Sequence, residues 1–137
     1  MTLLRNACEN PKGKNEKEII MYLSENHILM HIDSLCEEIY NERRGIDLIK
    51  LLETAFGWAA DSQSPDLVKL GISLMGMMNL DDRDDCREVI VTLGKYEEFT
   101  LYSLYAVTEW RNAAEIISDY AINLKGWGKT HAELWKE

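Results

Sequence analysis

The chain has 137 residues, of which 46% are hydrophobic and 28% charged, a size and composition typical of one globular domain with a buried core. The formal net charge of −9 and the absence of any basic run longer than Arg43-Arg44 argue against nucleic-acid binding, which needs clustered lysine and arginine. No apolar stretch approaches the roughly 20 residues of a membrane span, and no signal-peptide core is present. We therefore expect a cytoplasmic protein with neither a membrane nor a nucleic-acid partner.

Short helices are predicted along the first 45 residues. The first covers residues 2–9, and the second begins at a cap on Asn15 and ends near residue 26. Ser34 and Glu37 have the spacing of a capping box, in which each side chain satisfies a free backbone amide of the other residue. A third helix is therefore expected from about residue 33 to residue 44.

The helix predicted at residues 64–80 is expected to be the central element of the fold. Ser64 is a good N-cap and Pro65 suits the first helical position. Its apolar side chains cover nearly the whole circumference, with only Lys69 strongly polar, so neighbours should bury it on more than one side. The helix before it, at residues 46–60, carries apolar side chains at i, i+3, i+4 and i+7.

Four more helices are predicted after residue 80. The acidic run at residues 81–85 is expected to cap the first, which ends at Gly94, and the others cover residues 96–108, 113–124 and 127–137. Short connectors make successive helices antiparallel, and helix starts recur roughly every 15 to 18 residues, which suits stacked hairpins. We expect one all-α domain over residues 1–137, a right-handed α-solenoid of antiparallel hairpins, with an irregular helical bundle as the alternative.

The hairpin series at residues 46–124 resembles bacterial HEAT- or armadillo-like helical-repeat proteins. The closing segment Gly126-Trp127-Gly128-Lys129-Thr130-His131-Ala132 also looks like a helix opening in longer members of that group. In those longer members further repeats follow such a segment, whereas the present sequence stops at Glu137. The resemblance implies a HEAT-like solenoid for this chain. Some members of the group carry a hydroxylase label, so the resemblance also raises an enzyme as an alternative.

The residues that could support catalysis or metal binding do not form a known motif. His27 and His31 are four apart, but Asn26 is expected to interrupt a helix there, and the acidic run at residues 81–85 lacks the glycine and glutamate of a calcium loop. The three cysteines have no CxxC spacing and are expected to be buried thiols in a reducing compartment: Cys8, Cys36 and Cys86. We expect no metal, no cofactor and no catalytic residue, which favours a non-catalytic protein over an enzyme.

Aromatic side chains in the C-terminal half are the candidate partner-binding residues. Most combine an apolar ring with a polar atom, which suits a half-buried surface: Tyr96, Phe99, Tyr102, Tyr105, Trp110, Trp127 and Trp135. The alternative is that these rings pack between hairpins. Leu134 and Trp135 are also expected to be uncovered at the end of the repeat, which would allow homo-oligomerisation through the C-terminal helix.

An acidic helical surface with aromatic side chains favours a scaffold or adaptor that binds another protein, with a basic partner as the best fit. Two other functions remain open from the residues. One is a small-molecule-binding protein or a hydroxylase with a pocket between helices near Met75, Met77, Met78 and the tyrosines. The other is an acidic inhibitor or immunity-type protein that blocks a basic enzyme surface.

Overall fold

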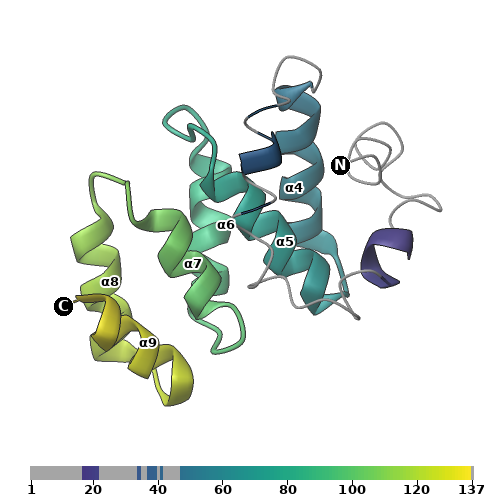
Figure 1. Cartoon of the computed structure of the whole chain (residues 1–137). Coiled ribbons are helices and arrows are strands. Elements are labelled where there is room, and N and C mark those ends of the chain that lie inside the picture. The colour runs from purple at the N-terminus through teal and green to yellow at the C-terminus, as the bar shows by residue number, and fades with distance from the viewer. Residues whose placement is uncertain (1–16, 22–33, 35–36, 40, 42–46, 137) are drawn as a thin grey trace. The chain divides into compact units, whose positions relative to one another are not determined.

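The computed structural model describes residues 17–21, 34, 37–39, 41 and 47–136 (Figure 1), and every regular element in that part of the chain is a helix. The all-α prediction is confirmed. The chain divides into two compact units, Met1–Leu74 and Met75–Glu137. The helix predicted at residues 2–9 lies outside the described residues, whereas residues 17–21 of the second predicted helix are helical.

In the first unit, helix α4 (Leu48–Asp61) begins at an aspartate cap. The Oδ1 atom of Asp47 accepts hydrogen bonds from the backbone N–H groups of Ile49 and Lys50, at 3.0 and 3.1 Å. These bonds satisfy amides that have no partner inside the helix. The helix predicted at residues 46–60 is confirmed, and its buried face consists of Leu51, Thr54, Ala55, Trp58 and Ala59.

Helix α5 (Pro65–Gly76) is the predicted central helix. The Ser64 hydroxyl accepts a hydrogen bond from the backbone N–H of Leu67 at 3.4 Å, as expected for the cap. Buried apolar side chains cover more than half of the circumference: Leu67, Val68, Leu70, Ile72, Leu74 and Met75. The helix ends at Gly76 rather than residue 80, because a tighter turn follows, in which the Met78 N–H donates to the Met75 carbonyl.

The second unit contains α6 (Asp84–Gly94), α7 (Thr100–Val107), α8 (Ala113–Asn123) and α9 (Gly126–Lys136). Helix α6 packs against α7, and α9 packs against both α8 and α7 (Figure 1). All four predicted helices are present. Helix α7 begins at Thr100 instead of residue 96, because the Thr100 hydroxyl donates to the carbonyls of Gly94 and Tyr96 and holds the intervening residues in a turn.

A buried polar cluster lies within the core of the second unit. The Tyr120 hydroxyl donates to the Val91 carbonyl at 2.8 Å and is 2.9 Å from the Ser103 hydroxyl. Burial raises the pKa of Tyr120 to about 12, because the phenolate would lose its hydration. The cluster ties α6, α7 and α8 together. No helix within the described residues is long and apolar enough to cross a membrane.

Candidate functional site

The seven aromatic residues predicted to bind a partner differ in exposure. Tyr96, Tyr105 and Trp127 are exposed, whereas Tyr102 is only 9% exposed and belongs to the core of the second unit. The other three are half-buried: Phe99, Trp110 and Trp135. The structure therefore leaves Tyr102 as a packing residue and divides the remaining aromatic side chains among different surfaces.

One group of apolar side chains lies on α7 and α9, and we call it the C-terminal aromatic surface: Tyr105, Trp127, Leu134 and Trp135. Helical geometry places its three α9 members within about 100° of one another around the helix axis. Trp127 and Leu134 are 66% and 64% exposed. The two are seven residues apart, so they lie about 10 Å from each other along the same side of α9. Large apolar side chains exposed on one side of a helix are typical of a binding surface.

Trp135 is held firmly within this surface. Its ring meets the Tyr105 ring edge to face, with centroids 4.6 Å apart and planes at 78°. Its Nε1–H donates to the Thr108 hydroxyl at 3.1 Å, and that hydroxyl donates in turn to the Leu104 carbonyl. The expectation that Leu134 is uncovered is confirmed, whereas Trp135 is partly covered by its contacts with α7.

The start of α9 is fixed by a contact that is distant in sequence. Gly126 has a φ of +63°, a left-handed conformation that glycine adopts without strain. The carboxylate of Glu97, in the turn between α6 and α7, accepts a hydrogen bond from the Trp127 N–H at 2.9 Å. Glu97 thus caps α9 and sets the position of the C-terminal aromatic surface. Periodicity could not identify Glu97, because the cap comes from 30 residues away.

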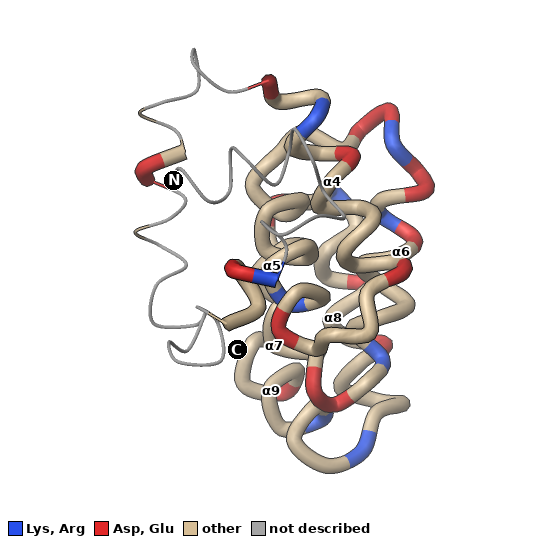
Figure 2. Tube along the Cα trace, turned by 90° about the vertical axis from the view of Figure 1, so that its right-hand side faces the viewer, with Lys and Arg blue, Asp and Glu red and all other residues tan. Residues whose placement is uncertain are grey.

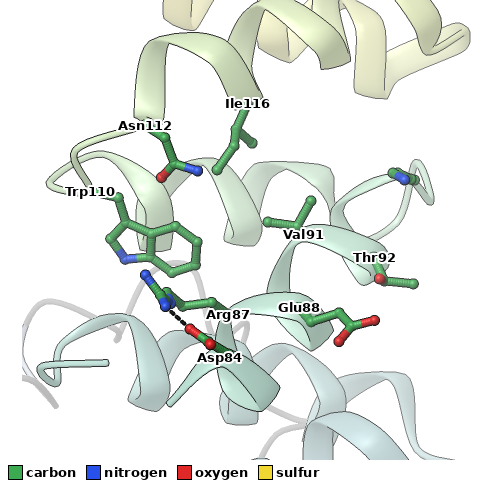
Figure 3. A pocket seen from close by; sticks show the side chains of 9 residues that line it. Asp84, Arg87, Glu88, Val91, Thr92, Trp110, Asn112 and Ile116 are labelled. Atoms are coloured by element: carbon green, nitrogen blue, oxygen red, sulfur yellow. Dashed lines mark hydrogen bonds and ion pairs between the residues drawn. The ribbon is translucent and has the colours of Figure 1, made fainter. Parts of the chain in front are cut away.

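A second feature is an open groove of about 550 Å³ between α6 and the start of α8 (Figure 3). One wall is a face of α6 and the other comes from the α7–α8 turn and α8. Its lining residues are Asp84, Arg87, Glu88, Val91, Thr92, Lys95, Trp110, Asn112 and Ile116. Of these, only Trp110 belongs to the predicted set. The lining residues on and just after α6 recur at three- and four-residue spacing, which is a local signal that they share one face of a helix. Asn112 and Ile116 come from the start of α8 and had no such signal.

Two of the four aspartates in the acidic run at residues 81–85, which leads into α6, form ion pairs, and Figure 2 shows acidic positions with a basic position among them. Arg83 binds both carboxylate oxygens of Asp85, at 2.9 and 3.0 Å, and these hydrogen bonds lower the pKa of Asp85 to about 2. Arg87 pairs with Asp84. The acidic run was expected to cap α6 with a side chain. The N-cap residue of α6 is instead Arg83, whose side chain makes no hydrogen bond to the backbone of the first turn. The aspartates of this run instead favour the helix N-terminus by their charge.

The remaining candidates for chemistry do not converge on a site. His27 and His31 lie outside the described residues. No group of three histidine, cysteine, aspartate or glutamate side chains that could hold a metal occurs within the part of the chain described. Met75 is fully buried, and neither Met77 nor Met78 lines the groove, so the groove is not the pocket expected near these methionines.

Comparison of the chain with protein-family models, with curated proteins and with solved structures finds no match. The surfaces of the chain itself are therefore the basis of the function proposed below.

Proposed function

We propose that the chain is a non-catalytic protein-interaction module, built from HEAT-like stacked hairpins, which binds another protein through the C-terminal aromatic surface. The observation that carries the proposal is the exposure of Trp127 and Leu134 on one side of α9, at 66% and 64%. Tryptophan and tyrosine are enriched among the residues that dominate binding energy at protein interfaces. The fixed Tyr105–Trp135 pair beside them would lose little side-chain freedom on binding.

The charge of the chain indicates the kind of partner. A net charge of −9 repels acidic proteins and attracts basic ones, which accelerates association at low salt. Acidic and basic positions are interspersed on the helices of the second unit (Figure 2), so the attraction comes from the overall excess of acidic residues rather than from a single acidic face. The proposed partner is therefore basic, and its capture should weaken as salt is raised.

Self-association is the second proposed use of the same surface. Two copies could bury Trp127 and Leu134 against each other about a two-fold axis, because the surface would then meet its own equivalent. The two uses differ in how they respond to concentration. A homo-oligomer forms in the purified protein, whereas a complex with a basic partner needs that partner.

The test uses a double variant, Trp127→Ala with Leu134→Ala, and a matched control, Ile122→Ala. Ile122 is an equally exposed apolar residue, at 69%, on α8 outside the surface. The wild-type protein and the control, immobilised, should retain the same basic protein from native lysate, and the double variant should lose it. Loss of an interface aromatic typically weakens binding by about 2 kcal/mol, roughly 30-fold.

Sedimentation velocity of the three purified proteins over a range of concentrations would detect self-association separately. If the double variant retains the same proteins as the control and has the same sedimentation behaviour, the C-terminal aromatic surface is not a binding site. If the retained protein is an enzyme and its activity falls on binding, the module acts as an inhibitor.

A further inference from the structure

The groove beside α6 has the dimensions of a short peptide site. The wall formed by α6 and the residue after it runs from Asp84 to Lys95, a length of roughly 16 Å at the helical rise. That length matches about five residues of extended chain. The groove's volume of about 550 Å³ is comparable to that of ligand-binding clefts, and it is open to solvent, as a peptide site must be.

The middle of the groove is apolar. Val91 from α6 and Ile116 from α8 face it from opposite walls, and the indole of Trp110 lies between these walls at one side (Figure 3). All three side chains are half-buried, so each still exposes apolar surface to solvent. An aliphatic side chain placed here would contact both walls and the face of the indole ring, which is the usual anchor of a peptide in a groove.

The charges at the edge of the groove are unequal. Arg87 is neutralised by Asp84, whereas the structure gives Glu88 and Lys95 no ion pair with any described residue. Among the exposed residues directly next in sequence to the lining residues, Asp85 is paired with Arg83, and Glu109 and Glu115 outnumber Arg111, which leaves a small negative excess. Glu88 therefore supplies the unpaired negative charge of the α6 wall, and Lys95 lies about two helical turns further along the chain.

From this arrangement we propose that the groove binds a basic peptide segment of a partner protein, with an aliphatic side chain against Trp110, Val91 and Ile116 and a lysine or arginine beside Glu88. The site shares no residue with the C-terminal aromatic surface. The proposal is therefore independent of the proposed function, and either can fail without the other.

The test is an NMR titration of the ¹⁵N-labelled full chain with two pentapeptides. The basic probe is acetyl-Lys-Ala-Leu-Ala-Lys-amide and the acidic probe is acetyl-Glu-Ala-Leu-Ala-Glu-amide. The indole N–H signal of Trp110, assigned by its loss in Trp110→Phe, reports occupancy of the groove directly. The other three tryptophans provide internal references for non-specific effects.

The basic probe should shift the Trp110 signal saturably, and the acidic probe should bind at least about threefold more weakly. Glu88→Lys should reduce affinity for the basic probe by about fivefold, as expected for reversing one exposed charge. Asp61→Lys makes the same change in net charge at an exposed position of α4 and should alter the affinity less than about twofold. The double variant at Trp127 and Leu134 should bind the probe like the wild-type protein.

Three results would overturn the proposal. They are the absence of a saturable shift at Trp110, equal binding of the two probes, and equal effects of Glu88→Lys and Asp61→Lys. A melting curve of each variant shows that it is folded, and Glu88→Gln provides a milder change at the same exposed position.

Discussion

Replacement of Gly71 by alanine should destabilise the first unit, although alanine forms helices better than glycine. In an isolated helix this replacement stabilises by about 1 kcal/mol, because glycine loses more backbone freedom on folding. In α5, a Cβ atom on residue 71 would lie 2.6 Å from the carbonyl oxygen of Ala55 and 2.9 Å from the backbone nitrogen of Ala59. Both atoms belong to the backbone of α4, so no side-chain rotation relieves the overlap.

The expected magnitude follows from two opposing contributions. Overpacking costs about 1–3 kcal/mol, and a clash with backbone atoms belongs at the upper end, because a whole helix must move. After the helix gain of about 1 kcal/mol is subtracted, the net loss in free energy of unfolding is about 2 kcal/mol. For a chain of this size the melting temperature should fall by roughly 6–10 °C.

Gly57 provides the matched control, because it lies within α4 of the same unit. No atom of the described residues is within 4 Å of a Cβ added there. Gly57→Ala should therefore stabilise by about 0.5–1 kcal/mol. Urea unfolding followed by circular dichroism at 222 nm measures both changes. If Gly71→Ala is as stable as the wild-type protein, the close backbone contact between α4 and α5 is wrong.

Three further predictions concern the second unit. Tyr120→Phe should lower the free energy of unfolding in urea by about 1–2 kcal/mol, because the buried Val91 carbonyl loses its donor. Since burial raises the pKa of Tyr120 to about 12, the stability due to this group should be complete below pH 10 and fall as the pH rises through 12. The variant should lack this pH dependence. The pKa of Asp85, measured by NMR of its carboxyl carbon, should rise from about 2 in the wild-type protein toward 3.8 in Arg83→Gln. In the wild-type protein, the contribution of Asp85 to stability is present above its unfolded pKa and should be lost as the pH falls through about 2. Glu97→Ala should remove the cap of α9 at a cost of about 1 kcal/mol, and hydrogen exchange should accelerate in α9 more than in α6; equal acceleration in both helices would contradict the capping role.

Helix positions were the most predictable feature of the chain, because the signals that specify them are local. Ser64 and Pro65 are adjacent to the amides they affect, and apolar periodicity marks the buried face of a helix without knowledge of its neighbour. The strongly apolar circumference of α5 likewise predicted its burial. Where boundaries were wrong, as at the start of α7, the cause was a hydrogen bond of the Thr100 side chain that periodicity does not register.

The functional surfaces depended on tertiary structure. Tyr102 and Tyr105 were both predicted to bind a partner, yet one is buried and the other 54% exposed, because the edge of the packed face runs between them. Sequence alone identified the acidic charge and the aromatic composition of the C-terminal half. Only the fold brought Glu97 to the start of α9 and Trp110 to the groove beside α6, because contacts across 20 to 30 residues depend on how the helices pack and not on local pattern.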